Sequence, residues 1–256
     1  MVKSSAPTRI RSVRRAATLL EHIALSPAGC TATAAAGAPD VPVPTAYHLL
    51  NTLVDAGLLA KDERRRYRLG AKMGLLAEAF LAQVSAPAYL VDRLRELADR
   101  TGETAYLSAW RGSDAVLLQI VEGRRAVRVS GLHLGYSGIA HARASGKVLL
   151  AYGRPGTLEE YLATHRISAR TPKTVSGADA LRAEIEGARR AGYAVDEEEF
   201  AEGVACIAAP VADGTMAIGI SVPVERYRSL RQELIDAVVA VAGSAAAPQL
   251  HAAGGA

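Results

Sequence analysis

The sequence predicts an α+β protein of two domains, a small one at the N-terminal end followed by a larger one. At 256 residues the chain is long for one compact domain and comfortable for two. Its early part shows helical periodicity before two short extended runs, and its later part mixes strands with helices. Charge divides at the same place, because residues 1–72 carry a net charge of +6 and residues 73–256 carry −2. A basic module on a mildly acidic body favours a polyanion-binding head attached to a sensor.

The small domain is predicted over residues 9–71, after a tail at 1–8 that we expect to be disordered. Its elements are a helix from Ile10 that ends at Ser26-Pro27, a short Ala-rich helix over 33–38, a helix opened by Pro44 and Thr45 and closed by Gly57, and a β-hairpin over 58–70. Helix, short helix, helix and hairpin in this order are typical of a winged helix-turn-helix domain.

A further helix is predicted between the two domains, over residues 72–86. Its apolar stripe consists of Met73, Leu76, Ala77, Phe80, Leu81 and Val84. This stripe is wider than a simple linker needs, so we expect a linker and dimerisation helix that packs on a second chain.

The larger domain is predicted over residues 87–245, with an Ala- and Gly-rich tail at 246–256 that we expect to fray. Strands are expected near 104–110, 115–121, 126–131, 193–197, 204–211 and 215–222, the last two joined by a turn at Asp213-Gly214. Helices are expected near 89–100, 142–152, 157–165, 178–191 and 226–241, with a Gly-rich loop at 131–138. Antiparallel strands with helices on their faces indicate an α+β sensor-type domain.

Composition excludes several classes of protein. No apolar run approaches the roughly 18 residues that span a bilayer, and no apolar segment follows the basic N-terminal residues. We therefore expect no membrane partner and no signal peptide, and place the chain in the cytoplasm. Cys30 and Cys206 are the only cysteines and lack CxxC spacing, and the six His lack HxxxH or HExxH spacing. We expect no disulfide framework, no metal and no cofactor.

Three stretches, read together and in order, carry a resemblance to a known family. They are SVRRAATLLEHIA with PTAYHLLNTLVDAGLL and YRLG, then GLHLGYSGIAHARASGKVLLAY, then GYAVDEEEFAEGVACIAAPVADGTMAIGISV. Over about residues 10–245 the chain resembles the isocitrate-lyase-regulator (IclR) family of bacterial transcription regulators. The resemblance implies a winged helix-turn-helix that binds double-stranded operator DNA, and a GAF-like domain that binds a small organic or aromatic acid. It also implies a homodimer or homotetramer without catalytic activity.

Candidate DNA-binding residues lie on the third helix and on the hairpin tip. The exposed helix positions, on faces not taken by the leucines, are Thr45, Tyr47, His48 and Asn51. The hairpin-tip residues are Arg64, Arg65 and Arg66, whose guanidinium groups can reach phosphates or the minor groove. Two alternatives stay open: Tyr47 as a cap on the core, and a tip that is merely solvated. The chain departs from the family where Val43 and Pro44 replace a usual Lys-Ser, and where His48 replaces a common Arg.

Candidate effector-binding residues come mainly from the resemblance. It implies pocket positions at Ala140, Val148, Asp196, Val204, Cys206 and Ser221, and helical spacing adds His141 and Ser145 beside Val148. The same spacing puts Arg143 on the side of Lys147, away from Val148, so its role stays open. Pro223 replaces the family's second pocket serine, which favours a larger and less polar ligand over a two- or three-carbon oxo acid.

Four other interpretations of these residues compete with this one. SGKVLL is not a phosphate-binding loop, because His141 stands where that motif needs glycine. The acidic run from Asp196 to Glu199 suggests a solvated strand edge more than a metal site. A hydrolase or transferase that uses Cys206 and His141 lacks a third orienting group. A regulator that no longer senses a ligand is the last alternative. The sequence favours a ligand-responsive, DNA-binding homo-oligomer.

Overall fold

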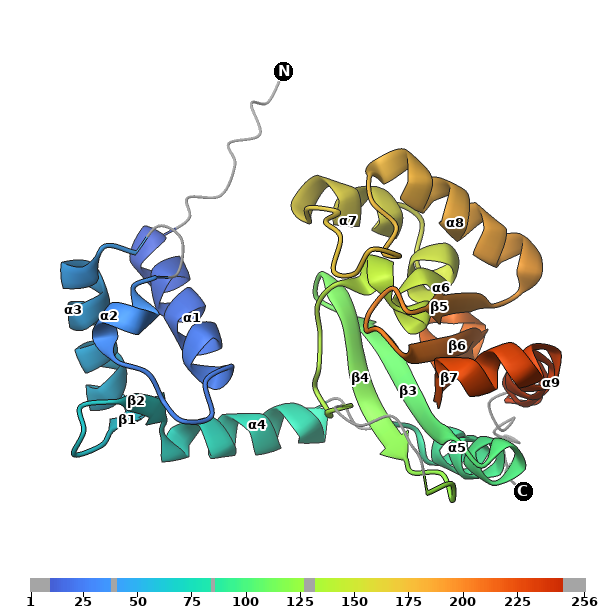
Figure 1. Ribbon diagram of the computed structural model, residues 1–256, viewed down its shortest axis with the longest axis horizontal. Helices are drawn as coiled ribbons and strands as arrows, with labels where there is room; N and C mark the ends of the chain where they lie inside the picture. The colour runs from blue at the N-terminus through green and yellow to red at the C-terminus, as the bar shows by residue number, and fades with distance from the viewer. Residues whose placement is uncertain (1–9, 38–40, 84–85, 127–131, 246–256) are drawn as a thin grey trace, which may run out of the picture. The chain divides into compact units, whose positions relative to one another are not determined.

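The structure is a computed structural model that describes residues 10–37, 41–83, 86–126 and 132–245. The chain divides into two compact units, Met1–Gln83 and Val84–Ala256 (Figure 1). The tails predicted at 1–8 and 246–256 lie outside the described residues, and so does most of the strand predicted at 126–131.

The first unit follows the predicted order of helices and hairpin (Figure 1). Its elements are α1 (Arg11–Ala24), α2 (Ala32–Ala35), α3 (Val43–Asp55), β1 (Leu59–Lys61), β2 (Tyr67–Leu69) and α4 (Ala71–Gln83). The short helix is shorter than predicted, and Thr31 caps it by accepting a hydrogen bond from the Ala34 N–H. The two strands pair antiparallel, with Leu59 opposite Leu69.

One small core holds this unit together. Buried side chains from α1, α3 and the hairpin meet there: Leu19, Ile23, Ala46, Leu50, Leu53, Leu59 and Tyr67. Because Ala46, Leu50 and Leu53 recur at helical spacing, they fix which face of α3 turns inward and which faces solvent.

Helix α4 has no buried residue within the described part of the chain. Its apolar side chains Leu75, Leu76, Phe80 and Leu81 lie exposed, Leu75 with 63% of its surface accessible. The contacts of α4 place it with the first unit.

The second unit is an antiparallel sheet between two layers of helices. Its strands are β3 (Thr104–Arg111), β4 (Asp114–Val121), β5 (Ala194–Glu197), β6 (Val204–Val211) and β7 (Met216–Pro223), in the order β4-β3-β7-β6-β5. Its helices are α5 (Ala88–Thr101), α6 (Ala144–Tyr152), α7 (Thr157–Thr164), α8 (Ala178–Ala191) and α9 (Val224–Gly243), with 3-10 turns η1 (Ala140–Ala142) and η2 (Ala212–Gly214). The turn predicted at Asp213-Gly214 is η2.

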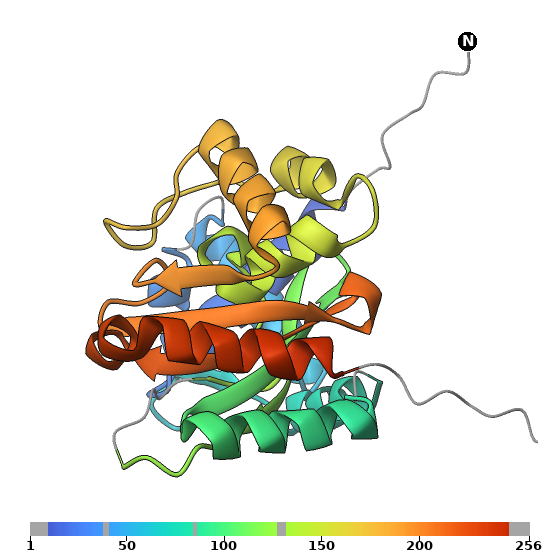
Figure 2. The same cartoon turned by 90° about the vertical axis from the view of Figure 1, so that its right-hand side faces the viewer.

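Alternation along the strands explains the two layers. Leu107, Ile207 and Ile220 belong to the core beneath α5 and α9. Ala115, Ala208 and Ala217 belong to a second core beneath α6, α7 and α8. Figure 2 shows α5 and α9 side by side on one face, with α7 and α8 beyond α6 on the other. The predicted α+β class is confirmed.

The helix predicted at 142–152 begins later than expected. Arg143 has extended backbone angles and is the residue before α6, so the segment divides into η1, Arg143 and α6. A Cβ at Gly146 would overlap the backbone of Ala140, so glycine is needed for η1 to pack this closely on α6. This junction determines where the Arg143 side chain points.

Within the described residues, no single helix is both long and apolar enough to cross a membrane, although α4 and α5 meet the length and composition criterion as a bent pair.

Candidate nucleic-acid interface and effector cavity

The outward face of α3 carries the four helix residues singled out from the sequence. Tyr47 and His48 are exposed, whereas Thr45 and Asn51 are half-buried. The Tyr47 ring is 37% exposed and lies outside the buried core, so it does not cap that core. Asn51 accepts a hydrogen bond from the Tyr67 hydroxyl at 3.2 Å, which ties this face to the hairpin.

The turn between β1 and β2 presents its three arginines to solvent. Arg64, Arg65 and Arg66 are all exposed. Asp62 shapes the turn, because its backbone carbonyl accepts from the Arg65 N–H and its carboxylate accepts from the Arg66 N–H at 2.8 Å. Arg65 has a φ of +60°, a left-handed conformation that closes the turn. Arg66 also donates to the carbonyl of Ala28 at 3.3 Å.

Tyr47 and the turn form one continuous surface. Arg65 donates to the Tyr47 hydroxyl at 3.3 Å, and the Lys61 ammonium lies 5.4 Å from the centre of the Tyr47 ring. The hydrogen bond from Arg65, followed by the charge of Lys61, lowers the pKa of Tyr47 below its ordinary value. Residues from α3 and the hairpin therefore share one exposed and cationic face.

The second unit contains a partly open cavity, whose atom-free space, open solvent included, is about 430 Å³. The four strands β3, β4, β5 and β6, the start of α6 and two loops line it with Tyr106, Leu117, Leu132, His133, Tyr136, Arg143, Ala144, Ser145, Asp196, Phe200 and Cys206. The loop that contributes Tyr136 is tied to β4, since the N–H and carbonyl of Leu117 bond to Tyr136 and Gly135.

Three of the eight effector residues considered from the sequence line this cavity: Ser145, Asp196 and Cys206. The other five, Ala140, His141, Val148, Val204 and Ser221, lie outside its lining. Ser221 contacts a lining residue, because its hydroxyl lies 3.4 Å from the Cys206 thiol across the β6–β7 pair. His141 is buried in η1 rather than on α6, and its ring bonds to the Tyr161 hydroxyl at 2.8 Å and the Ser168 carbonyl at 3.1 Å.

Arg143 was misplaced by the helical-spacing argument and lines the cavity. That argument assumed a helix through residue 143, whereas the extended backbone of Arg143 turns its side chain away from the Lys147 side. Its guanidinium donates to the carbonyl of Ala115 at 2.9 Å and lies 5.1 Å from the Tyr136 ring centre. The available signal was the position of Arg143 in the segment HARASGK, at the place where the predicted helix was expected to begin.

Tyr106, Asp196 and Cys206 are the titratable groups of the cavity that lie on the sheet. Asp196 is 1% exposed, and its Oδ1 accepts from the N–H groups of Glu199 at 2.7 Å and Phe200 at 3.0 Å. Burial, partly offset by these two bonds, raises the pKa of Asp196 to about 7. Burial also raises the pKa of Cys206 to about 12, so its thiol stays protonated at neutral pH.

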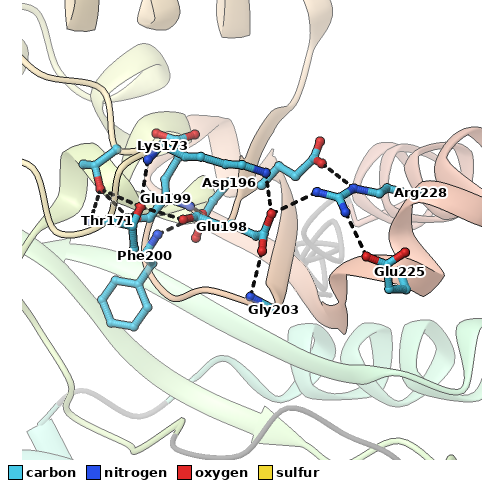
Figure 3. A network of polar contacts seen from close by, with 11 residues as sticks. Thr171, Lys173, Asp196, Glu198, Glu199, Phe200, Gly203, Glu225 and Arg228 are labelled. Carbon is cyan, nitrogen blue, oxygen red and sulfur yellow. Dashed lines mark hydrogen bonds and ion pairs between the residues drawn. The ribbon is translucent and has the colours of Figure 1, made fainter.

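The turn after Asp196 is held in place by ion pairs and hydrogen bonds (Figure 3). Glu198, with a φ of +63°, accepts from the Gly203 N–H at 2.9 Å and pairs with Arg228 of α9 at 2.9 Å and with Lys173. These pairings, led by that with Lys173, lower the pKa of Glu198 to about 2. The turn thereby fixes the Phe200 side chain, which lines the cavity.

The acidic run is not a solvated strand edge throughout. Asp196 and Glu199 are buried, and Glu199 pairs at 2.5 Å with Lys147, which is 2% exposed and also pairs with Glu184. Lys147 from the rejected phosphate-loop motif and Glu199 from the acidic run therefore belong to one ion-pair group, in which these two residues are buried and Glu184 is exposed. No cluster of metal-binding side chains occurs in the described parts of the chain.

The Cys206/His141 hydrolase alternative receives no support. The thiol is protonated and bonds to Ser221, and both ring nitrogens of His141 have other partners. A nucleophile needs a base within hydrogen-bond distance, and this pair does not form within the described residues.

Comparisons with known proteins agree with this geometry. The family model for the bacterial transcriptional regulator IclR C-terminal domain matches residues 82–249, and that for the IclR helix-turn-helix domain matches residues 12–63. The HTH-type transcriptional regulator BhcR of Paracoccus denitrificans is 33% identical over 239 residues, which are 91% of this chain and 85% of BhcR.

Solved structures share the fold. One assigned to the ICLR transcriptional regulators, from Silicibacter sp. TM1040, has a TM-score of 0.71 at 29% identity and covers 91% of this chain and 94% of its own. An IclR homolog from Microbacterium hydrocarbonoxydans, complexed with 4-hydroxybenzoate, has a TM-score of 0.60 at 23% identity and covers 91% and 99%. With both domain models matched in order along nearly the whole chain, the protein belongs to the IclR family of bacterial transcription regulators.

Proposed function

We propose that the chain is a homo-oligomeric regulator that reads operator DNA with α3 and the β1–β2 turn. When a small organic acid enters the cavity of the second unit, the regulator leaves the DNA or changes its arrangement on it. The observation that carries the proposal is the separation of two sites of different chemistry. An exposed cationic face lies in one unit, and a cavity lined by Arg143, Asp196 and aromatic side chains lies in the other. Since bacterial operators are cytoplasmic, we place the protein in the cytoplasm.

The DNA-binding part of the proposal rests on exposure and charge. Arginine binds phosphate in two-point contacts, and Arg64, Arg65 and Arg66 leave their guanidinium groups within reach of a duplex. Tyr47 and His48 project from the recognition helix, where side chains contact base edges. Val43 and Pro44 carry no phosphate-binding side chain, so the turn supplies a larger share of the positioning contacts.

The oligomeric part rests on α4. Leu75, Leu76, Phe80 and Leu81 are exposed on one helix of thirteen residues that has no buried position. An apolar surface of this kind is typical of a protein interface, and a second copy of the chain would place two DNA-reading units on one operator. We therefore propose that α4 contributes to a dimer.

The effector part rests on the lining of the cavity and on the protonation of its groups. A protonated Cys206, a hydrogen-bonded Asp196 and a helix start at Ala144 and Ser145 favour binding without covalent chemistry. We propose that the protein is not an enzyme. Effector binding changes DNA affinity only insofar as the ligand prefers one of two arrangements of the oligomer.

Selection from fragmented genomic DNA tests the DNA-binding function. The purified full-length protein is mixed with the fragments at 0.15 M salt, and retained DNA is sequenced. We expect enrichment of a few fragments that share two related half-sites. Retention without sequence enrichment would contradict an operator-binding function.

Substitution of Cys206 tests whether this cavity is the effector site. Cys206→Phe fills the cavity, so we expect a loss of stability of about 1–3 kcal/mol from overpacking and no release of the selected DNA by organic acids that release it from the parent protein. Cys206→Ala is the matched control and should keep the response. A response by Cys206→Phe equal to that of the parent would place the effector elsewhere.

A further inference from the structure

We propose that the start of α1 carries a second DNA-binding surface, made of Arg11, Arg14 and Arg15, which binds phosphates beside the groove that α3 reads. These three residues are called the α1 basic surface below. The inference rests on the proposed function, since it takes double-stranded DNA as the partner. It adds a contact surface outside the recognition helix and the β1–β2 turn.

The α1 basic surface has no counter-charge of its own. Arg11 and Arg14 are exposed, and Arg15 is half-buried. The one acidic residue of α1 is Glu21, which does not lie three or four positions from any of the three arginines, the spacing at which helical side chains meet. None of the three has an ion-pair partner among the described residues, so their charges are available to an external anion.

Helix α5 of the second unit shows the opposite arrangement. It has the same length as α1, 14 residues, and also three arginines, but it carries three carboxylates. Arg93 pairs with Glu96, and Arg95 pairs with Asp92, three positions away in each case. Such a helix is close to neutral and attracts a polyanion weakly, whereas α1 keeps an excess of positive charge.

The position of the arginines within α1 is unfavourable for the protein alone. The N-terminal end of a helix has a positive potential, which anions stabilise and cations oppose. The first turn of α1 holds no acidic residue, and its N-cap, Ile10, makes no side-chain hydrogen bond to it. The Nε of Arg15 is buried without a hydrogen-bond partner in the described part of the chain. A phosphate beside these arginines would neutralise the positive potential, so the gain is realised on binding DNA.

Packing puts the α1 basic surface beside the recognition helix. Leu19 of α1 and Leu50 of α3 share one core. Both helices lead into the hairpin at their C-terminal ends, α1 through the backbone pairing of Cys30 with Tyr67 and α3 through β1. Both therefore begin at the other end of the unit, as Figure 1 shows.

The spacing of packed helices matches the edge of the groove. The axes of two packed helices lie about 8–10 Å apart, whereas the major groove is about 12 Å wide. With α3 in the groove, the start of a neighbouring helix lies over the phosphates that border it. The α1 basic surface therefore contacts the DNA backbone without reading bases.

Arg11→Ala with Arg14→Ala tests the surface at its two exposed residues. Alanine favours a helix and the lost charges oppose its dipole, so the denaturation midpoint should equal or exceed that of the parent. Fluorescence anisotropy with a random duplex of about 30 base pairs measures the DNA affinity. We expect a loss of roughly 3–30-fold at 0.15 M salt, and a plot of log affinity against log salt that flattens by about one to two units.

Arg95→Ala with Arg100→Ala is the matched control, because it removes two exposed arginines from a helix of the same length and changes the net charge equally. It should keep the affinity and the salt slope of the parent. Ethylation interference on the operator selected from genomic DNA locates the contact. Ethylated phosphates that flank each half-site should weaken binding of the parent and leave binding of the α1 variant unchanged.

Three results would overturn the inference: an unchanged affinity and salt slope in the α1 variant, an equal loss in the control, or a smaller sedimentation coefficient of the α1 variant. The last result would assign α1 to a contact between subunits. These results are separable from failure of the proposed function. Retention of genomic fragments without sequence enrichment would contradict operator binding, while a loss of affinity for the random duplex would still support the α1 basic surface.

Discussion

The first unit exposes its cluster of cationic side chains to water, whereas the second unit buries two of its cationic side chains. Arg64, Arg65 and Arg66 lie exposed on one turn, while Arg143 and Lys147 are 8% and 2% exposed. Exposed charges are screened over about 8 Å at physiological salt, so they act collectively and on a large polyanion. A buried charge acts at short range on one group in a fixed position. The two units therefore differ in the size of ligand that their charges can recognise.

Charges placed on α4 should have the largest effect, because they alter the exposed apolar residues of the first unit. Leu76→Glu with Phe80→Glu should dissociate the oligomer at micromolar concentration. Loss of the tether between two DNA-reading units should weaken operator binding by about 10²–10⁴-fold. Sedimentation velocity and gel-shift titration measure the two effects. Leu25→Glu adds the same charge at an apolar residue that is also exposed and should change neither. A monomer with full operator affinity would contradict the role of α4.

In contrast to the exposed charges of the first unit, the buried carboxyl group of Asp196 should make the free energy of unfolding depend on pH. Burial raises the pKa of Asp196 to about 7, from about 4 in an unfolded chain. The folded state therefore holds this proton more tightly, so the stabilisation is complete below pH 4 and is lost as the pH rises through 7. Relative to Asp196→Asn, the parent should lose on the order of 2–4 kcal/mol of unfolding free energy between pH 4 and pH 8.

Denaturant titrations at each pH measure that difference. Asp213→Asn, at the exposed η2 turn, is the control and should run parallel to the parent. Parallel profiles for the parent and Asp196→Asn would show that Asp196 is solvated, and would remove the contrast between the two units at this residue.

Removal of the three turn arginines should have an intermediate effect. Arg64→Ala, Arg65→Ala and Arg66→Ala together should weaken binding to specific and random duplexes by similar factors, roughly 10–100-fold at 0.15 M salt. The plot of log affinity against log salt should flatten by about one unit per lost phosphate contact. In the control variant, three exposed arginines of the second unit are replaced by alanine: Arg154, Arg166 and Arg190. This variant should keep the affinity and the salt slope of the parent. An unchanged slope in the turn variant would mean that the turn points away from DNA.

The sequence predicted the elements and most of the exposed residues, because both follow from local pattern, although Thr45 and Asn51 are half-buried. Ala46, Leu50 and Leu53 mark the inner face of α3, and the outer residues follow by exclusion. Charged residues clustered at a turn are exposed in almost any fold, and Arg64 to Arg66 illustrate this.

The cavity was harder to predict, because its residues are brought together by the sheet and by one helix boundary. Arg143 was assigned to the wrong side, since a helix start two residues later than predicted changes the direction of its side chain. The burial of Glu199 depends on Lys147 and Glu184, which are distant in sequence and meet only in the folded unit. Local hydrophobic periodicity carries no information on ion pairs between residues that are distant in sequence.

The smallest effect is expected at Tyr47, where the turn contacts the recognition helix. Tyr47→Phe removes the hydroxyl that accepts from Arg65 but keeps the ring near Lys61. Because the hydrogen bond lies in water, the variant should lose less than about threefold in operator affinity and keep the salt slope of the parent. Arg65 and Lys61 lower the pKa of Tyr47, so the parent should ionise one tyrosine earlier than the variant in an absorbance titration. A loss comparable with that of the three-arginine variant would mean that Tyr47 reads a base through its hydroxyl, rather than holding Arg65 toward the DNA.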